Sequence, residues 1–411
     1  MNDEQVTQVH RSSFIVHRYA SLVDNRRLRP QVIFLGLVSL LNDSASEMIY
    51  PLLPVFLTST LGATPLIVGL IEGTADALSS ILKLVAGWIS DRVPRRKPFI
   101  VGGYALAAIS RAWIAVAGRW PSVLAARLLD RTGKGIRSAP RDAMIADVTP
   151  VESRGRAFGF QRALDHAGAI VGPLLALLFL NALQFPMRSV FMIAVIPGAI
   201  GVVLLMIALR EEPRGAVGFS PPVDGLKVAT PLPRSFYGAL AAIALFSLAN
   251  SSDAFLILQA HAAGVSTGML PLLWASHHVI KALFSTHAGA ASDRFTRRYL
   301  LVAGWTTYAV IYFLFPFAHS ITAFFVLFIA YAIPFTLSEG AERAWISDFV
   351  PAELRGRSYG VYYLVTGVGV LIGTAIFGLL YQNVSPSAAF NVGAALAVAA
   401  AVSVLAAGRK R

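Results

Sequence analysis

Long apolar runs dominate this sequence and limit the folds available to it. A helix that crosses a bilayer needs roughly 20 mostly apolar residues. Twelve such stretches follow one another, at approximately residues 31–59, 66–90, 98–118, 121–146, 157–183, 188–210, 236–262, 267–291, 299–318, 321–347, 358–381 and 387–408. They lack the alternation of barrel strands, and only 14% of the residues are charged. The sequence therefore predicts an all-α integral membrane protein with twelve transmembrane helices.

The sequence also repeats itself at a spacing of about two hundred residues. Residues 87–96 read GWISDRVPRR and residues 289–298 read GAASDRFTRR, and each closes an apolar stretch. A second pair reads DVTPVESRGRAFG at 147–159 and DFVPAELRGRSYG at 348–360. Two homologous halves of this kind are typical of secondary transporters, whose site lies between the halves.

Basic residues gather in alternate loops and in the two terminal tails. The net charge is +13, and the positive-inside rule places these loops and both termini in the cytoplasm. We therefore expect a multi-pass protein of the cytoplasmic (inner) membrane. Its predicted parts are an N-terminal tail (1–30), a six-helix half (31–210), a cytoplasmic linker rich in Pro, Gly and charge (211–235), and a second six-helix half (236–408). The chain has no cysteine, which excludes disulfides and thiolate metal sites.

The G-x-x-x-D-R-x-x-R-R loops resemble a motif of the major facilitator superfamily (MFS), and the six-plus-six layout covers nearly the whole chain. The resemblance implies the MFS fold with two pseudo-symmetric halves. It also implies that these loops help to latch the halves together on the cytoplasmic side. The residues concerned are Gly87, Asp91, Arg92 and Arg96, with Gly289, Asp293 and Arg294 as the second copy. The same arginines also fix the topology, and the two roles are compatible.

Two further segments resemble MFS motifs. Residues 131–135, RTGKG, are similar to the R-x-x-x-G motif of proton-linked members, with Lys134 where glutamine is commoner. Residues 168–173, GAIVGP, match part of a motif associated with antiporters. Small residues at this spacing also allow ordinary close packing of membrane helices, and we favour packing for this segment.

Ionisable side chains at membrane depth are costly unless they face a cavity or a partner, so each is a functional candidate. The candidates for proton coupling or substrate binding are Asp43, Glu47, Asp76, Arg131, Lys134, Asp165, Asn250, Asp253 and His278. The related sequences SLLN at 39–42 and SLAN at 247–250 favour a cavity shared by both halves. Asp43 and Asp165 lie near the estimated midplane and are our first choices as proton carriers. The alternative for each acid is an internal ion pair that holds the bundle together.

The fourth stretch carries an unusual stripe of charge. Asp130, Lys134, Arg137 and Arg141 recur at helical spacing and share one face. Such a wall would attract an anionic substrate or pair with acids of neighbouring helices, whereas arginines at the interface extend to lipid headgroups. We expect the first role for Arg131 and Lys134 and the second for Arg141.

These observations predict a proton-coupled secondary transporter that exports a small amphiphilic or anionic organic solute by alternating access. One alternative is transport of a metal ion or metal chelate, because carboxylate and imidazole side chains are ligands for divalent first-row metals. The residues concerned are Asp43, Glu47, Asp76, Asp165, His166, Asp253, His277 and His278. Another alternative is a non-transporting membrane receptor with the same fold. No G-x-x-x-x-G-K-[ST] loop or H-E-x-x-H motif occurs, so we expect no enzyme activity, cofactor or resident metal. The expected partners are the solute, protons and the bilayer, without nucleic acid, and we expect a monomer.

Overall fold

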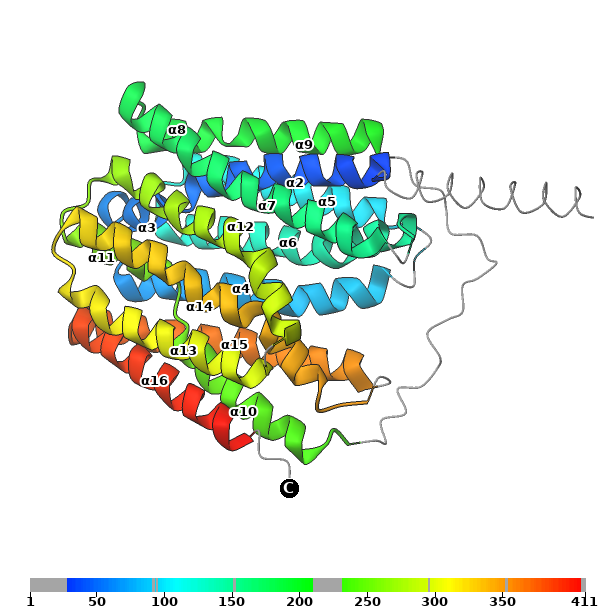
Figure 1. Ribbon diagram of the computed structural model, residues 1–411. Coiled ribbons are helices and arrows are strands. Elements are labelled where there is room, and N and C mark those ends of the chain that lie inside the picture. The colour runs from blue at the N-terminus through cyan, green and yellow to red at the C-terminus, as the bar shows by residue number, and fades with distance from the viewer. Residues whose placement is uncertain are drawn as a thin grey trace, which may run out of the picture.

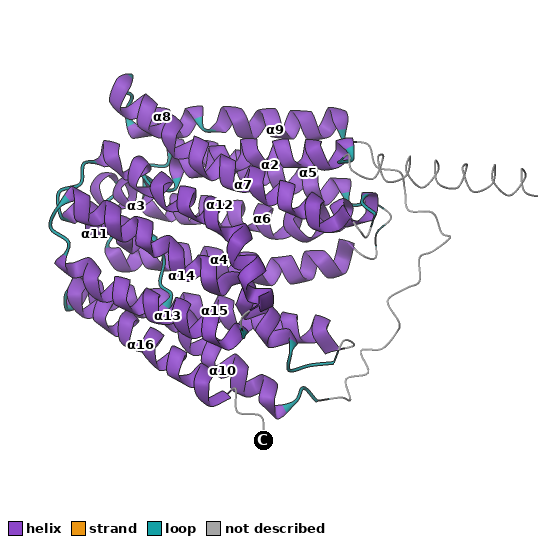
Figure 2. Cartoon of the chain, viewed as in Figure 1, coloured by secondary structure: helices purple, strands orange, loops and turns teal. Residues whose placement is uncertain are grey.

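The computed structural model describes residues 28–90, 93, 95–150, 153–209, 231–294, 296–351 and 354–407. Long helices lie side by side in one bundle (Figure 1), and short loops connect them (Figure 2). The N-terminal half contains α2 (Pro30–Ile49), α3 (Leu53–Val55), η1 (Phe56–Thr60), α4 (Pro65–Ser90), α5 (Lys97–Val116), α6 (Trp120–Val148), α7 (Arg154–Leu177), η3 (Leu178–Ala182), α8 (Met187–Ile193) and α9 (Val195–Ala208). The C-terminal half contains α10 (Arg234–Ala249), α11 (Ala254–Ala262), η4 (Thr267–Met269), α12 (Leu270–Arg294), α13 (Arg297–Leu314), η5 (Phe315–Phe317), α14 (Ile321–Ser347), α15 (Arg355–Asn383) and α16 (Pro386–Ala407).

The helices confirm the predicted all-α membrane fold. Ten helical segments of the described chain are long and apolar enough to cross a membrane. Two more long helices, α6 with 29 residues and α12 with 25, lie among them. These two carry charged and histidine side chains along much of their length, which lowers their hydropathy. The charged side chains of α6 and α12 are therefore candidates for the functional site.

The predicted helix over residues 236–262 is interrupted, which corrects the sequence-based expectation of one continuous helix. Helix α10 ends at Ala249, and α11 begins at Ala254. The intervening residues, Asn250 to Asp253, have short polar side chains that compete with helical hydrogen bonds. Ser252 Oγ accepts a hydrogen bond from the Ala254 N–H at 3.3 Å. The break places four polar residues in the interior of the bundle.

Helices α2 and α7 approach until their backbones touch, through the glycines of residues 168–173. A Cβ atom at Gly168 would lie 2.7 Å from the Leu40 carbonyl oxygen. A Cβ atom at Gly172 would collide with the carbonyl oxygen of Ser44. Helix packing therefore accounts for both glycines of this segment.

The Gly172→Ala variant is expected to destabilise the protein by about 1–3 kcal/mol, because the added methyl group forces α2 and α7 apart. Thermal unfolding of the purified variant measures this loss. Gly159→Ala is the matched control on the same helix, since a Cβ atom there meets nothing within 4 Å. Equal melting temperatures for the two variants would contradict the close approach.

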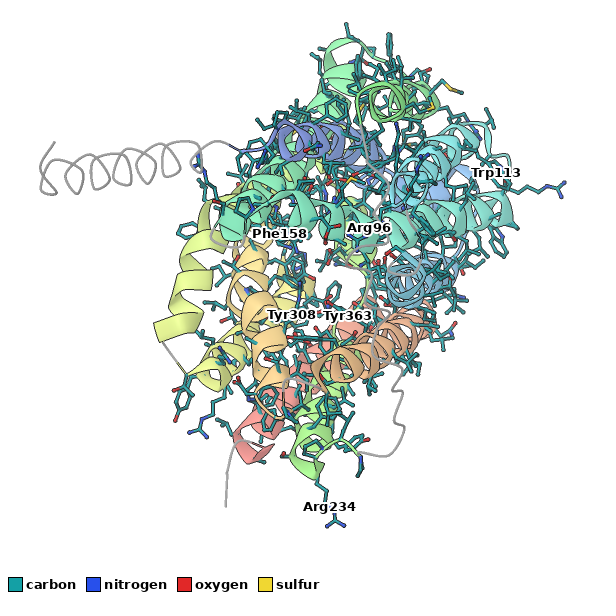
Figure 3. All side chains as sticks on the ribbon, turned by 90° about the vertical axis from the view of Figure 1, so that its right-hand side faces the viewer. Arg96, Trp113, Phe158, Arg234, Tyr308 and Tyr363 are labelled. Carbon is teal, nitrogen blue, oxygen red and sulfur yellow. The ribbon has the colours of Figure 1, made fainter. Side chains whose placement is uncertain are left out.

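The two ends of the bundle differ in character. We call the end that carries the loops after α4, α6, α12 and α14 the basic end, and the opposite end the far end. Figure 3 views the bundle along its length from the basic end; in this projection Arg96 and Phe158 of the N-terminal half appear above Tyr308 and Tyr363 of the C-terminal half. The predicted linker at 211–235 lies largely outside the described residues, and α10 begins at Arg234.

The two halves contact each other along α4 with α15 and along α7 with α12. Near the far end, the Leu66 N–H donates to Gln382 Oε1 at 3.4 Å. On the other side of the bundle, Asn181 Nδ2 donates to the Gly268 carbonyl oxygen at 3.2 Å. Helix α11 also packs on α3 and α4. These contacts hold the halves together at the far end.

Candidate functional site

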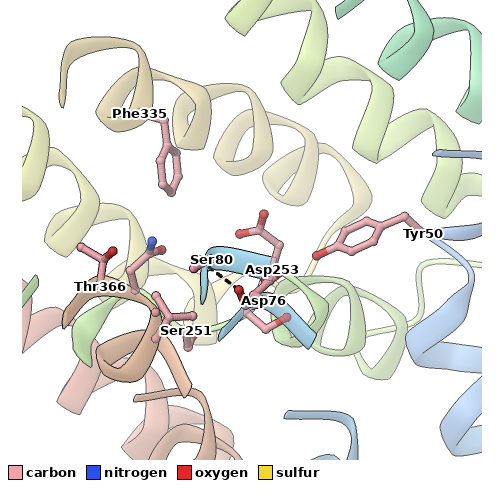
Figure 4. A pocket seen from close by; sticks show the side chains of 11 residues that line it. Tyr50, Asp76, Ser80, Ser251, Asp253, Phe335 and Thr366 are labelled. Carbon is pink, nitrogen blue, oxygen red and sulfur yellow. Dashed lines mark hydrogen bonds between the residues drawn. The ribbon is translucent and has the colours of Figure 1, made fainter. Parts of the chain in front are cut away.

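A cavity of about 220 Å³ lies between the two halves. It is lined by residues of α4, α14 and α15, by Tyr50 at the end of α2 and by the break between α10 and α11. Its carboxylates, Asp76 and Asp253, come from different halves. Figure 4 shows them close together, with Tyr50 and Phe335 on opposite sides. The interrupted helix thus supplies part of the wall of a central polar cavity.

A buried network of ion pairs connects α4 with α6. Arg127 bonds both carboxylate oxygens of Glu72, at 2.5 and 3.0 Å, and lies 3.5 Å from Asp130. Arg131 pairs with Asp130 at 3.6 Å and with Asp76 at 3.0 Å. Glu72, Arg127 and Asp130 are buried, whereas half of the Asp76 side chain is exposed. The network therefore has a structural interior and one accessible acid, Asp76, at the cavity.

The predicted charged face of α6 divides among three environments. Lys134 is exposed and lies within electrostatic range of Asp43 and Asp76. Arg137 is buried, with its guanidinium 4.5 Å from the centre of the Tyr104 ring. Arg137 thus packs on α5 and does not extend a common basic wall.

Arg141 also departs from the expectation. Its Nη1 donates to Ser39 Oγ at 3.0 Å and lies 3.9 Å from Asp165. The predicted role of Arg141 in contacting headgroups is therefore wrong. Helix α6 lies between other helices, so Arg141 finds its partners inside the bundle.

The two acids chosen as proton carriers have different surroundings. Asp165 Oδ1 accepts hydrogen bonds from Ser39 Oγ at 2.6 Å and from Gln161 Nε2 at 3.0 Å, with Arg141 nearby. Asp43 Oδ1 accepts one from Asn42 Nδ2 at 3.0 Å. The acids are close enough to interact electrostatically. The sequence did not identify Ser39 or Gln161 as a partner of Asp165, although Gln161 precedes Asp165 by one helical turn.

Glu47 makes a hydrogen bond that crosses between the halves. Trp274 Nε1 on α12 donates to Glu47 Oε2 on α2 at 2.8 Å. The Trp274 ring also lies 5.0 Å from the ring of Tyr50. Trp274 is not among the site residues selected from the sequence, because no local pattern indicates its partner.

His278 lies against Trp274, with ring centres 5.0 Å apart. Neither of its buried ring nitrogens has a hydrogen-bond partner in the part of the chain that the structure describes. His278 is the repeat counterpart of Asp76, but it is not among the residues that line the central cavity. The structure thus separates these two candidates.

Asp253 is positioned by aromatic residues of the C-terminal half. Its Oδ1 accepts a hydrogen bond from the Tyr331 hydroxyl at 2.7 Å. Tyr331 in turn packs near Tyr308 and Tyr312, with ring centres 5.8 and 6.1 Å away. Lys281 Nζ lies 5.2 Å from the centre of the Phe335 ring and within electrostatic range of Asp253. Asn250 also lines the cavity.

The loop-motif residues at the basic end are described in part. Arg96 is buried and its Nη1 lies 2.5 Å from Asp147 Oδ2, which ties the start of α5 to the end of α6. In the other half, Arg297, which aligns with Arg95, pairs with Asp348. Gly87 allows ordinary contact with Ala139 of α6, since a Cβ atom there would lie 3.4 Å from the Ala139 Cβ.

The remaining residues of the loop motif have no described side chains. Asp91 and Arg92 lie outside the described residues. Gly289, Asp293 and Arg294 belong to α12, where the structure describes the helix but not their side chains.

Arg111 is a buried cation that the sequence analysis did not select. Its Nη2 donates to the Asn42 carbonyl oxygen, to Asn42 Oδ1 and to Ser46 Oγ, at 3.2, 2.7 and 2.9 Å. A single arginine in the apolar stretch 98–118 was the available signal. Arg111 orients the segment of α2 that carries Asp43 and Glu47.

Metal binding was the alternative suggested by the acids and histidines. Within the described ranges, no group of three or more His, Asp or Glu side chains is placed to hold a metal ion.

Two comparisons with known sequences cover most of the chain. The family model described as Major Facilitator Superfamily matches residues 35–275 and 239–411. An uncharacterised MFS-type transporter of Methanocaldococcus jannaschii is 33% identical over 388 residues, which are 93% of this chain and 96% of the relative. The multidrug resistance protein MdtH of Edwardsiella ictaluri is 33% identical over 128 residues, which are 31% of this chain and 32% of that protein.

Solved structures share the fold at low sequence identity. A bacterial homologue of the human lysosomal transporter Spinster, in an inward-facing and unoccupied conformation, aligns with a TM-score of 0.71 and 19% identity, over 92% of this chain and 94% of the homologue. The POT family transporter PepTSo aligns with a TM-score of 0.76 and 14% identity, over 93% of this chain and 98% of the transporter.

Proposed function

Because this chain belongs to the Major Facilitator Superfamily, whose members are membrane transporters and not enzymes, we propose that it is a proton-coupled secondary transporter. It moves a small amphiphilic or anionic organic solute by alternating access of a central site, in the direction of export. The observation that carries the proposal is the cavity between the halves, with one accessible carboxylate from each half, Asp76 and Asp253.

The chemistry of the cavity supports an amphiphilic solute. Tyr50 and Phe335 offer aromatic surface, while Asn250 and neighbouring hydroxyls offer hydrogen bonds. Lys134 and Arg131 on α6 are not among the lining residues, but both lie close enough to act on the lining residue Asp76. They would supply positive charge beside the cavity for an anionic group of the solute. Export is supported by the similarity to a multidrug resistance protein over part of the chain.

Asp43 is the proton carrier in this proposal. A proton on Asp165 would compete with the donors Ser39, Gln161 and Arg141 for the same carboxylate. Asp43 accepts only the hydrogen bond from Asn42 in the described residues, which leaves its second oxygen available for a proton. Lys134, within electrostatic range of Asp43, would respond to each change of its charge.

The proposed orientation places the basic end in the cytoplasm. The arginines there, such as Arg95 and Arg297, follow the positive-inside rule. The gating role of the loop motif belongs to this end, with Arg96 and its partner Asp147 at the junction of α5 and α6. We place the protein in the cytoplasmic membrane as a monomer, with both termini inside.

The proposal is tested with purified protein in liposomes, using a pH-sensitive dye inside and a panel of organic anions, neutral amphiphiles and organic cations outside. One class of solute is expected to drive proton movement that depends on the protein. For a solute that donates a hydrogen bond to Asp253, or that carries a positive charge, the Asp253→Asn variant is expected to require a higher solute concentration. For an anionic solute, which this carboxylate repels, the variant is expected to require a lower concentration. Solute transport without any proton movement would overturn the coupling. Absence of solute movement, beside an active control transporter, would favour the receptor alternative.

A further inference from the structure

We propose that the hydrogen bond between Trp274 and Glu47 is a proton-sensitive tie that holds the two halves together on the far side of the cavity. The inference rests on the proposed function, and it assigns Trp274 as a positioning residue for the alternation between states. Glu47 and Trp274 come from α2 and α12, which belong to different halves. A change in this bond therefore acts directly on the contact between the halves.

The geometry of the pair suits such a role. Trp274 Nε1 can only donate a hydrogen bond, and its partner Glu47 Oε2 lies at 2.8 Å. Trp274 is 4% exposed, so water does not readily replace the bond. The ring of Tyr50, one turn beyond Glu47, lies 5.0 Å from the Trp274 ring. The halves therefore meet here through the hydrogen bond from Trp274 to Glu47 and through the adjacent contact between the Trp274 and Tyr50 rings.

The position of the tie is also informative. Trp274 lies near the beginning of α12, on the same side of the bundle as the contact of Asn181 with Gly268 at the far end. Glu47 lies beyond the middle of α2 toward the same end. Opening of the far end separates α2 from α12 and must break the bond.

Several charged or titratable groups surround the tie. Within electrostatic range of Glu47 are Asp43 on the same helix and Arg131 and Lys134 on α6. Helix α5 contributes Arg111, which bonds Ser46, and α7 faces Glu47 with Gly172. On α12, His277 and His278 pack on Trp274 at 5.6 and 5.0 Å. Of these groups, Glu47 alone accepts the indole hydrogen bond.

Protonation of Glu47 changes the strength of the tie. A hydrogen bond to a carboxylate is roughly twice as strong as one to a neutral acceptor. A deprotonated Glu47 therefore favours the state with the far end closed, and a protonated Glu47 weakens this preference. In an exporter that exchanges solute for protons, the tie would prevent the transporter from opening at the far end when it holds neither solute nor a proton. It would thereby prevent conformational cycles that are not coupled to transport.

The test measures the distance between spin labels on the full chain in liposomes. The chain has no native cysteine, so Ser59→Cys and Ser266→Cys supply the only labelling sites, both exposed and at the far end of different halves. Lowering the pH is expected to raise the ratio of long to short distances by about tenfold in the protein that carries only these two labels. This is the size of effect expected when the acceptor of the hydrogen bond changes from a charged carboxylate to a neutral acid. Glu47→Gln keeps an acceptor for the hydrogen bond but cannot titrate. At every pH it is expected to show the distance distribution that the unaltered protein has at low pH, which we call the acid-like distribution.

Two variants separate the tie from general packing. Trp274→Phe is expected to give the acid-like distribution and to lose its pH dependence. Trp305→Phe is the matched control, because it removes a buried indole whose nitrogen has no hydrogen-bond partner in the described residues and which lies within the C-terminal half. Its distribution should match that of the unaltered protein.

A pH-dependent distribution that persists in Glu47→Gln would overturn the proposal and assign the effect to another group, such as the histidines of α12. A shift in Trp274→Phe that leaves the pH dependence unchanged would reduce Trp274 to a packing residue. The distances report the conformational equilibrium whether or not solute moves. A failure of the transport proposal would therefore appear as absent flux with the tie intact.

Discussion

Replacing Asp43 with asparagine is expected to reduce solute-driven proton movement to the level of protein-free liposomes. The Asp43→Asn substitution keeps the size of the side chain and an oxygen that can accept the hydrogen bond from Asn42. The new amide cannot carry a proton at any physiological pH. If Asp43 is the carrier, solute and proton movements lose their connection. The dye assay with the solute class identified for the unaltered protein measures this loss.

The Asp165→Asn variant distinguishes Asp43 from Asp165 as the proton carrier. Asp165 accepts hydrogen bonds from Ser39 and Gln161 and lies near Arg141, so its replacement is expected to lower thermal stability more than Asp43→Asn does. Coupled transport should survive in part. The reverse pattern, with normal coupling in Asp43→Asn and none in Asp165→Asn, would transfer the carrier role to Asp165. Solute binding by both variants, measured by thermal shift, shows that each is folded.

The second large effect concerns stability, and it follows from the buried ion pairs of α4 and α6. Arg127→Met is expected to destabilise the protein by about 3–5 kcal/mol, because it leaves Glu72 as a buried charge without its partner. Glu72 and Arg127 are 3% and 8% exposed at their side chains, so water offers little compensation. Thermal unfolding in detergent measures the change as a lower melting temperature.

A double variant provides the control for this prediction. Glu72→Leu combined with Arg127→Met removes both charges and is expected to recover a large part of the lost stability, since apolar side chains can replace a buried ion pair at little cost. Arg131→Met tests the boundary of the network, because its partner Asp76 is half exposed and can be solvated. A loss equal to that of Arg127→Met would show that the whole network acts as one structural unit.

Much of the fold could be predicted from residue type and order. The apolar runs located the spanning helices to within a few residues, because the bilayer admits little besides helices of that length. The densely charged α6 was counted among the twelve stretches, at residues 121–146, although it is not among the ten helices of the described chain that are apolar enough to cross a membrane by composition. The break at Asn250 to Asp253 was missed. Its four short polar residues disfavour a continuous helix, but the apolar residues on both sides led us to predict one helix across them.

The candidate site could be predicted only as a set of residues at a common depth. The four-residue spacing of Asp43 and Glu47 predicts that they share one face of a helix. Charge at membrane depth singled out Asp76, Arg131 and Asp253. Spacing along one helix says nothing about which neighbour a side chain meets. Arg137 and Arg141 share a face with Lys134, yet they contact α5 in one case and α2 with α7 in the other.

The sequence by itself determined that this protein is a bundle of membrane helices in two related halves, because composition and repetition are properties of the chain alone. Only the tertiary structure decided which buried charges neutralise one another and which face the cavity. Glu72 and Asp76 are one helical turn apart, but Arg127 encloses the first while the second stays half exposed. The bond from Trp274 to Glu47 joins residues 227 positions apart. Such partners are set by how helices pack, and packing depends on shapes that no local sequence pattern encodes.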